Sequence, residues 1–363
     1  MKKTIIFTGG GTAGHVFPGL AVFRQLEKEA EKDGIELDLR WMGSRKGMER
    51  QIIEAEGIPY IGLPSGKLRR YFSFQNFLDL FNIGSGFLIA LIRLASLKPA
   101  AIFSKGGYVS VPPVMAAKFL RIPVFAHESD SSPGLATRIS SRFAHRILLS
   151  LEETKGYFPD SMNSRLIVTG NPVRREIYDA DRAEGRKTLG LDDKTPFILV
   201  LGGSQGARQI NDLIFDMAPE LVKHTRILHQ MGELTYKESN IPGYETRKFI
   251  REELPNFISA ADIVISRAGA ATLWELAVLG KPMILIPLGT GSSRGDQLKN
   301  AEILKARGAA EVFYGEIEPI ELKNRILNLA KDEKTLEKMG QAAKKLVSQN
   351  SAVVISRMLL EYI

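Results

Sequence analysis

The sequence predicts an α/β protein made of two doubly wound domains, and three observations support this fold class. Short apolar runs typical of strands alternate with amphipathic helical runs along most of the 363 residues, which indicates parallel sheets with helices on both faces. Two of these runs, Ile5–Thr8 and Ile198–Leu201, each lead into a glycine-rich loop. Between the two halves, Gly170-Asn171-Pro172 breaks the alternation. The chain length also suits two domains, at roughly 100–200 residues per domain.

The individual elements follow from these runs. In the first half we expect a helix at Val16–Lys32 and strands at Thr4–Thr8, Glu36–Met42, Ala101–Phe103, Val124–Ala126, Arg146–Leu149 and Leu166–Val168. In the second half we expect strands at Phe197–Leu201, Arg226–His229, Ile263–Ile265, Met283–Ile286 and Ala310–Phe313. The stretch from Gly340 to Ile363 is helical in pattern, with no strand after it. We therefore expect domains at residues 1–172 and 173–340, facing across a cleft, and a C-terminal helix at 341–363 that packs back on the first domain.

The composition narrows the function. The chain contains no cysteine, which excludes disulfides, thiolate metal sites and cysteine nucleophiles. Its five His are scattered, so no metal site is indicated. The net charge of +8 suits an anionic partner such as a phosphorylated substrate or a membrane face, or serves solubility alone. No RNA-binding motif is present, so we expect no nucleic-acid partner.

No apolar signal region opens the chain, and the apolar run Phe87–Ile92 is closed by Arg93, well short of the ~18 residues that a spanning helix needs. We therefore expect a cytoplasmic protein. The segment at residues 67–98 mixes basic with apolar side chains, a pattern that suits the surface of an anionic membrane. The same pattern is compatible with an ordinary helix whose apolar face lies in the core.

The first loop has the spacing Gly9-x-Gly11-x-x-Gly14, which is typical of dinucleotide-binding folds. That function needs an acid at the end of the second strand to hold a ribose, and none is found there. A phosphate site or a purely structural turn remains. His15 follows at the start of a helix, whose positive end favours the neutral imidazole. His15 is thus a candidate general base, or simply a residue that hydrogen-bonds a loop.

The second loop, Gly202–Arg208, lacks the Gly-Lys-Ser/Thr ending of a P-loop, so ATP hydrolysis is not indicated. Ser204 and Gln205 in this loop are candidate donors to a phosphate or a sugar. The alternative is a simple turn between strand and helix.

The segment Ser266–Leu276 follows a predicted strand and opens a helix with small residues. Ala271 and Thr272 can present N–H groups to a diphosphate, and Glu275 can accept both hydroxyls of a ribose. Glu275 is equally explained as an acid near a helix start. In the loop after Met283–Ile286, Asp296 and Gln297 are candidates for binding sugar hydroxyls.

Two further loops end strands of the first half. Residues 104–110, with Gly106 and Gly107, can hold a second diphosphate, and residues 127–130 add acids to the same rim. The alternative is that both are merely solvated. The pair Asp179-Ala180-Asp181 follows no strand, and we interpret it as a solvated helix start and not as a metal site.

Taken together, these motifs resemble the MurG family of bacterial glycosyltransferases. The resemblance rests on segments that occur in one order over nearly the whole chain: Thr8–Gly19, Gly106–Ser110, His127–Asp130, Gly170–Arg174, Gly202–Arg208 and Ser266–Gly269 with Glu275. Members transfer N-acetylglucosamine from UDP-N-acetylglucosamine to lipid I (undecaprenyl-pyrophosphoryl-N-acetylmuramyl-pentapeptide), which gives lipid II for peptidoglycan. Some members have Asn where Asp130 stands, and two Gln where Asp296-Gln297 stand.

The resemblance implies the two-domain glycosyltransferase B fold, an inverting mechanism, no cofactor and no required metal. It implies that His15 or Glu128 takes the proton of the acceptor's 4-hydroxyl. The acceptor diphosphate would lie at Gly106, Gly107 and Tyr108. The donor site would be formed by Thr12, Ala13, Gly14, Asp130, Arg174, Ser204, Gln205, Ile250, Ala270, Ala271, Thr272, Leu273, Glu275, Asp296 and Gln297.

The resemblance also implies a peripheral protein on the cytoplasmic side of the inner membrane, docked on anionic lipids through the 67–98 segment. Two other functions fit the same motifs. One is a UDP-N-acetylglucosamine epimerase of the same architecture, which needs no acceptor. The other is a UDP-sugar binding protein without turnover.

Overall fold

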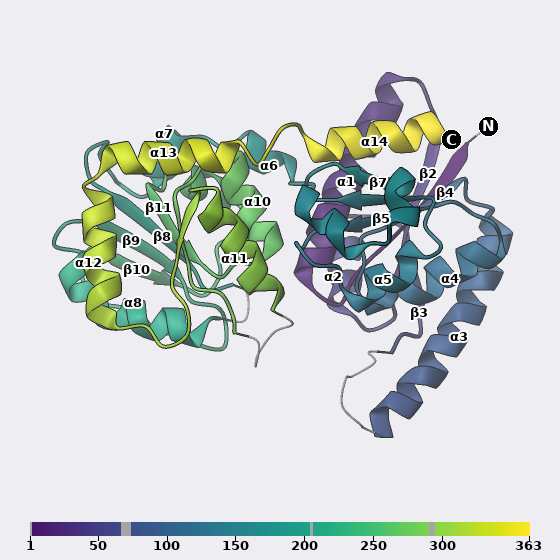
Figure 1. Cartoon of the computed structure of the whole chain (residues 1–363), viewed down its shortest axis with the longest axis horizontal. Helices are drawn as coiled ribbons and strands as arrows, with labels where there is room; N and C mark the ends of the chain where they lie inside the picture. The colour runs from purple at the N-terminus through teal and green to yellow at the C-terminus, as the bar shows by residue number, and fades with distance from the viewer. Residues whose placement is uncertain (1, 67–73, 204–205, 290–294) are drawn as a thin grey trace. The chain divides into compact units, whose positions relative to one another are not determined.

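The computed structural model describes residues 2–66, 74–203, 206–289 and 295–363. These divide into two compact units (Figure 1). Unit 1 comprises Met1–Arg174 and Gln349–Ile363, and unit 2 comprises Arg175–Ser348. Each unit has one parallel sheet with helices on both faces, so the predicted doubly wound α/β fold is confirmed.

Unit 1 has a seven-stranded sheet in the order β3-β2-β1-β4-β5-β6-β7. Its strands are β1 Lys3–Thr8, β2 Leu37–Ser44, β3 Tyr60–Leu63, β4 Ala101–Ser104, β5 Val124–Glu128, β6 Arg146–Leu149 and β7 Leu166–Val168. Phe7, Phe103 and Phe125 are buried on the face that carries α1. Parallel strands that are covered on both faces read as apolar runs, which is why the central strands are visible in the sequence.

The helices of unit 1 follow the strands in alternation. They are α1 Ala13–Lys32, α2 Met48–Ala55, α3 Phe74–Leu97, α4 Val111–Phe119 and α5 Leu135–Ser141, with short 3-10 turns η1 Tyr108–Ser110, η2 Glu152–Tyr157 and η3 Asp160–Arg165. Helix α1 begins three residues before the predicted Val16. The glycine loop therefore ends at Thr12, and His15 lies inside the first turn of α1.

Unit 2 has a six-stranded sheet in the order β10-β9-β8-β11-β12-β13. Its strands are β8 Phe197–Leu201, β9 Arg226–Gln230, β10 Tyr244–Arg247, β11 Ile263–Ser266, β12 Met283–Leu285 and β13 Ala310–Val312. Its helices are α6 Arg175–Tyr178, α7 Arg182–Thr188, α8 Arg208–Leu221, α9 Leu254–Ala260, α10 Ala270–Val278, α11 Asp296–Ala306, α12 Pro319–Ala330 and α13 Glu333–Lys344.

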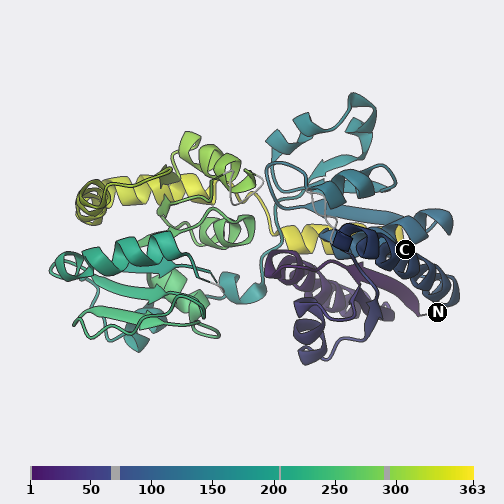
Figure 2. The same ribbon diagram turned by 90° about the horizontal axis from the view of Figure 1, so that it is seen from below.

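The C-terminal stretch differs from the single helical run that the sequence predicts from Gly340. Helix α13 ends at Lys344, and α14 begins anew at Ser351 and ends at Tyr362. Asn350 causes the restart, because its side-chain oxygen caps α14 by accepting from the backbone N–H groups of Ala352 and Val353. Helix α14 belongs to unit 1 and lies beside α1 in both ribbon views (Figures 1 and 2).

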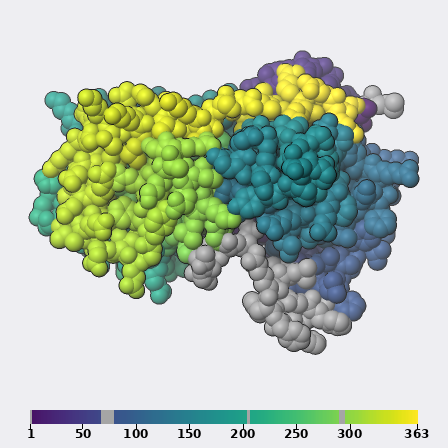
Figure 3. Space-filling view, viewed as in Figure 1, coloured from purple at the N-terminus to yellow at the C-terminus, as the bar shows by residue number. Residues whose placement is uncertain are grey.

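Polar contacts hold α14 on α1. Arg357 of α14 pairs with the buried carboxylate of Glu29 and, at 2.7 Å, with Asp33. Ile355 and Leu359 are fully buried in the core beneath. The outer face of α14 lies on the surface of the molecule (Figure 3). The last residues of the chain thus complete the core of the first half of the fold.

Candidate functional site

Hydrogen bonds to the side chains of Glu49 and Trp41 hold the glycine loop that follows β1. Glu49 is fully buried, and its carboxylate accepts from the backbone N–H of Gly11 at 3.1 Å and from the hydroxyl of Ser44 at 2.5 Å. Trp41 Nε1 donates to the carbonyl of Gly9 at 3.1 Å. The loop is therefore fixed in shape before any ligand arrives. Sequence reasoning missed Glu49, which lies on α2 outside every motif that the sequence analysis singled out.

The second loop of unit 1 lies directly against the first. Gly106 and Gly107 both adopt the left-handed region, with φ of 89° and 79°. A β-carbon added to Gly107 would collide with the carbonyl oxygen of Gly10 and stand 3.1 Å from Cδ2 of His15. The two glycines thus allow the imidazole and the loop backbone to touch. The structure brings together four of the predicted residues: His15, Gly106, Gly107 and Tyr108.

The Gly106–Gly107 loop leads into η1 and then α4. Ser110 secures this entry, since its hydroxyl and its backbone N–H both bond the carbonyl of Gly107, at 2.8 Å and 3.1 Å. A glycine loop that runs into a helix start is a general anion site, because backbone N–H groups and the helix dipole both favour negative charge. The arrangement suits a diphosphate at this loop.

The carboxylate of Glu128, the second candidate base, accepts hydrogen bonds from the backbone of its own loop. Its side chain is 4 % exposed. One carboxylate oxygen accepts from the backbone N–H of Asp130 and the other from that of Gly134, both at 3.1 Å. The carboxylate therefore shapes the loop that carries Asp130. This engagement favours His15 over Glu128 as the group that receives a proton.

In unit 2, a buried polar chain supports the glycine loop that follows β8. Tyr244 OH donates to His229 Nδ1 at 2.8 Å, and His229 Nε2 donates to Asn211 Oδ1 at 3.0 Å. Asn211 in turn donates to the Met231 carbonyl at 2.7 Å. Burial lowers the pKa of His229 to about 3, so the ring is neutral as these bonds require.

Two glycines of the loop after β8 lie directly against side chains below it, as the positions of added β-carbons show. One added to Gly202 would stand 2.8 Å from Asn211 Oδ1, and one added to Gly206 would collide with Thr235. The predicted donor residues Ser204 and Gln205, in the middle of this loop, lie outside the described residues. His229, Asn211 and Tyr244 were not predicted, because no spacing in the sequence joins them.

The predicted diphosphate site lies at the first turn of α10. Gly269 is the N-cap, and Ala270–Leu273 form the first turn. Arg267 holds the segment that leads into α10, because it donates to the Ile286 carbonyl at 2.8 Å and to Gln209 Oε1 at 3.0 Å. Glu275 lies one turn further along α10 and is partly exposed, as are Ala271 and Thr272. A ligand can reach all three side chains.

The remaining predicted donor residues have defined places. Gln297 Oε1 accepts from the backbone N–H of Leu288 at 3.1 Å, which joins α11 to the segment after β12. Asp296 is the first residue of α11, where an acid is favourable. Ile250 is 1 % exposed, and its N–H donates to Gln230 at 2.9 Å. Thr12, Ala13, Gly14, Asp130 and Arg174 are partly or fully exposed residues of unit 1.

The acidic pair at residues 179–181 has structural roles. Asp181 is the N-cap of α7 and accepts from the N–H groups of Ala183 and Glu184. Asp179 pairs with Arg175 at 3.0 Å. The predicted helix start is confirmed. In the part of the chain that the structure describes, no group of three or more His, Asp or Glu side chains is arranged to hold a metal ion.

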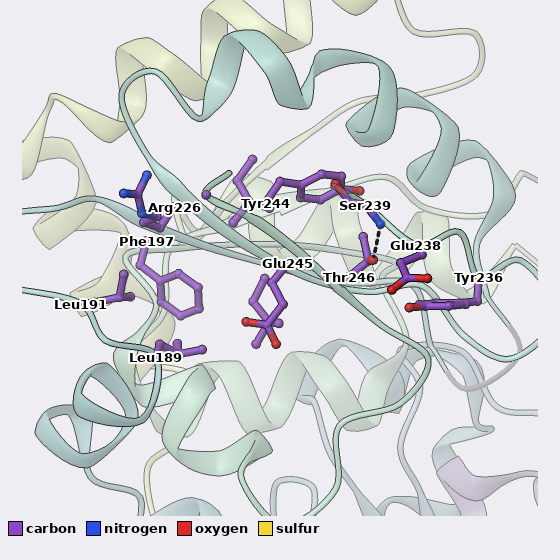
Figure 4. A pocket seen from close by; sticks show the side chains of 13 residues that line it. Leu189, Leu191, Phe197, Arg226, Tyr236, Glu238, Ser239, Tyr244, Glu245 and Thr246 are labelled. Carbon is purple, nitrogen blue, oxygen red and sulfur yellow. Dashed lines mark hydrogen bonds between the residues drawn. The ribbon is translucent and has the colours of Figure 1, made fainter. Parts of the chain in front are cut away.

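Unit 2 contains a pocket of about 450 Å³ (Figure 4). Phe197, Arg226 and Tyr244 line it, and each is the first residue of its strand. Ser239 donates to Thr246 at 3.2 Å on its rim. In doubly wound sheets ligands bind at the carboxyl ends of strands, so we do not assign the donor to this pocket at the amino ends.

Apolar side chains are exposed on α3 and α4. Leu80, Phe81, Leu88 and Ile92 of α3 are each more than half exposed, and Phe119 of α4 is 71 % exposed and contacts Phe87. By length and composition alone, Asp79–Leu97 could cross a membrane, which the sequence interpretation did not foresee. However, Ala90 and Leu94 are fully buried in unit 1, so α3 is a surface helix with one packed face. The basic residues Lys67, Arg69 and Arg70 lie outside the described residues.

Comparison with known proteins gives the family. The glycosyltransferase family 28 N-terminal domain matches residues 5–149, and the family's C-terminal domain matches residues 197–355. A UDP-N-acetylglucosamine--N-acetylmuramyl-(pentapeptide) pyrophosphoryl-undecaprenol N-acetylglucosamine transferase from Treponema denticola is 46 % identical, over 99 % of this chain and 98 % of that protein.

Solved structures agree. The crystal structure of MurG from Acinetobacter baumannii aligns with a TM-score of 0.75 at 26 % identity, over 99 % of both chains. A UDP-GlcNAc 2-epimerase from Neisseria meningitidis, bound to UDP-GlcNAc, aligns with a TM-score of 0.70 at 16 % identity, over 99 % of this chain and 100 % of the other. The second likeness shows the fold alone and gives no support to the epimerase alternative.

Proposed function

The chain belongs to glycosyltransferase family 28, within its MurG family of lipid I N-acetylglucosaminyltransferases, and from this premise we propose how its residues perform the reaction. The enzyme transfers N-acetylglucosamine from UDP-N-acetylglucosamine to lipid I. We assign the donor to unit 2 and the acceptor to unit 1. The two assignments rest on different loops, and they can be tested separately.

The donor proposal rests on the start of α10. The N–H groups of its first turn are suited to the UDP diphosphate, and Glu275 is suited to the two ribose hydroxyls. Ser204 and Gln205 belong to the same site in this proposal, as do Ile250, Asp296 and Gln297. From unit 1, Arg174, Asp130 and Thr12–Gly14 are the residues that we assign to the donor.

The acceptor proposal rests on the contact between His15 and the Gly106–Gly107 loop, which is the observation that carries the mechanism. A lipid I diphosphate held at that loop and at Tyr108 would bring the attached muramyl sugar near the imidazole. We propose that His15 takes the proton from the 4-hydroxyl as that oxygen attacks the anomeric carbon. Direct displacement inverts the anomeric configuration and releases UDP.

The leaving diphosphate gains negative charge in the transition state. We propose that the N–H groups at Ala271 and Thr272 and the guanidinium of Arg174 stabilise this charge, so that no metal is needed. Preorganised donors of this kind are effective because they need no rearrangement during the reaction. The ordering of Arg267 beneath the α10 start, described above, supports this proposal.

The base assignment is tested by replacing His15. We expect His15→Ala to lower kcat by about 10²–10⁴-fold, the usual contribution of a general base, with a short-chain lipid I analogue as acceptor. His224→Ala is the matched control, because His224 is exposed on unit 2 after α8. Near-normal turnover of His15→Ala would exclude His15 as the base. Equal losses in both variants would indicate a nonspecific effect.

We also propose where the enzyme works. The exposed apolar residues of α3 and α4 would enter the surface of an anionic membrane, with the basic residues of the 67–98 segment beside the lipid headgroups. In this proposal the enzyme is a peripheral protein at the cytoplasmic face of the inner membrane. The acceptor, whose undecaprenyl chain is lipid-soluble, would then reach unit 1 without leaving the bilayer.

A further inference from the structure

One buried lysine joins three loops at the carboxyl edge of the unit 1 sheet. Lys105 directly follows β4, and its side chain is only 1 % exposed. Its Nζ donates to Ser129 Oγ at 2.5 Å, and Ser129 Oγ donates onward to Asn171 Oδ1 at 2.6 Å. Ser129 follows β5 and Asn171 follows β7, so a single ammonium group ties the ends of three strands together.

The stem of Lys105 also supports the loop that carries His15. A β-carbon added to Gly9 would stand 2.9 Å from Lys105 Cβ, and one added to Gly19 would stand 3.6 Å from it. The lysine therefore lies beneath the glycine loop and immediately before Gly106. The glycine loop after β1 and the Gly106–Gly107 loop, which form the proposed acceptor site, are therefore both adjacent to Lys105.

Lys105 lies close enough to Glu128 and Asp130 to interact electrostatically with both carboxylates. Burial lowers the pKa of Lys105 to about 8, and Glu128 and Asp130 act against that lowering. The ammonium form therefore prevails at pH 7. The other titratable neighbour, His127, is neutral because burial and Lys105 lower its pKa, and its Nε2 donates to the Gly170 carbonyl at 2.9 Å. The Lys105 ammonium is thus attracted by the carboxylates of Glu128 and Asp130.

We propose that Lys105 is a positioning residue of the acceptor site. Its ammonium holds the three loops in place and offsets the negative charge of Glu128 and Asp130. The Gly106–Gly107 loop beside it can then accept an anionic diphosphate. Without this cation the two carboxylates would repel the diphosphate through a poorly screened interior. The inference rests on the proposed placement of the acceptor diphosphate at Gly106–Gly107.

The first test removes the charge. We expect Lys105→Met to raise the KM for a short-chain lipid I analogue at least about tenfold, while the KM for UDP-N-acetylglucosamine stays within about twofold. Lys105→Gln keeps a hydrogen-bond donor for Ser129 but has no charge, and we expect the same rise. Lys105→Gln replaces the Met variant if that variant does not fold. An unchanged acceptor KM in a folded variant would overturn the proposal.

The second test compensates for the positive charge that Lys105→Met removes. In Lys105→Met with Asp130→Asn, one negative charge is removed together with the positive one, and we expect the acceptor KM to return to within about threefold of wild type. A purely structural lysine would give a double variant at least as impaired as the single one, and that result would overturn the proposal. Asp130 is also assigned to the donor site, so only the acceptor KM is compared.

Lys281 provides a matched control in unit 2. It is also buried, with a pKa lowered to about 8 by burial, and its Nζ donates to the carbonyls of Ser259 and Ala261. We expect Lys281→Met to lower the melting temperature and leave the acceptor KM unchanged. An acceptor KM raised as much as in Lys105→Met would assign the effect to general destabilisation and overturn the proposal.

The placement of the acceptor is tested independently with Gly107→Ala. If Gly107→Ala leaves the acceptor KM unchanged, the diphosphate does not lie at this loop and the proposed acceptor site itself fails. If Gly107→Ala raises the acceptor KM and Lys105→Met does not, the acceptor site stands and the role of Lys105 is excluded.

Discussion

No side chain fits between Gly107 and the ring of His15: a β-carbon added to Gly107 would stand 3.1 Å from the imidazole Cδ2. Residues 92 positions apart, at the ends of neighbouring strands β1 and β4, thus form one surface. A proposed base and a proposed diphosphate loop share this surface. This close approach requires the absence of a side chain at 107, which makes it easy to perturb.

Gly107→Ala should therefore impair the enzyme at the acceptor step. Alanine is strained at φ of 79°, and its methyl group would push the Gly10 carbonyl and the His15 ring away. We expect kcat/KM for the lipid I analogue to fall at least about 10²-fold, since small misplacements near a reacting centre have effects of this size. Gly156→Ala is the control, because a β-carbon there meets nothing within 4 Å. Steady-state kinetics with each substrate varied would show whether the donor KM is spared.

Glu275 is predicted to act on the donor alone. We expect Glu275→Gln to raise the KM for UDP-N-acetylglucosamine about 10- to 100-fold, because a neutral amide replaces charge-assisted bonds to the ribose. Glu337→Gln on α13 changes an exposed glutamate of the same unit and should have no effect. Direct binding of UDP, measured by calorimetry, would isolate this interaction from catalysis. Unaltered UDP affinity would remove Glu275 from the donor site.

The stability of unit 2 should fall in acid because of His229. The pKa of His229 is about 3 in the folded unit and 6.5 in the unfolded chain. Between these values the unfolded chain binds a proton that the folded unit excludes, so the free energy of unfolding decreases as pH falls through this window. His229→Gln should be less stable at pH 7 and lose less stability on acidification.

The pH dependence of the stability of unit 2 can be measured separately, because each unit contains one of the two tryptophans. Trp41 lies in unit 1 and Trp274 in unit 2. In a Trp41→Phe background, denaturant unfolding followed by Trp274 fluorescence reports on unit 2 alone. If wild type and His229→Gln respond to pH between 7 and 4 with equal slopes, His229 does not carry the effect.

Membrane docking should depend on the apolar surface of α3. We expect Leu88→Glu with Ile92→Glu to reduce co-sedimentation with anionic vesicles at least about tenfold, because both side chains are more than half exposed and would carry charge into the lipid surface. Ile320→Glu, on α12 of unit 2, is an equally exposed control at 64 %. Activity on a water-soluble acceptor should be retained. Vesicle binding that survives both changes would move the docking surface elsewhere.

The strands that the sequence did not reveal are two edge strands. Tyr60–Leu63 and Tyr244–Arg247 each pair with one neighbour only, and most of their side chains are partly exposed. Tyr244–Arg247 has the sequence YETR and lacks the apolar run that marks a central strand covered on both faces. Tyr60–Leu63 is apolar, but it directly follows Pro59 and contains Gly62, both of which weaken a strand pattern. The central strands, most of whose residues are buried, were predicted to within a few residues.

The candidate site also contains residues that the sequence reveals and residues that it does not. The glycine loops and the small residues opening α10 are contiguous in sequence, so their chemistry could be interpreted directly. Glu49 bonds Gly11, 38 positions away, His229 bonds Asn211, 18 positions away, and Lys105 bonds Ser129, 24 positions away. Only the fold brings these partners together. The groups that we propose to bind the ligands are thus easier to find in the sequence than the groups that hold their loops in place.

The transfer reaction itself tests the central claim most directly. Purified protein is mixed with UDP-N-acetylglucosamine, a short-chain lipid I analogue and EDTA, and the products are separated by mass. We predict the disaccharide product and UDP in equal amounts, with no product when the acceptor is omitted. Absence of disaccharide with and without added magnesium, or conversion of UDP-N-acetylglucosamine to its 2-epimer without acceptor, would contradict the assignment.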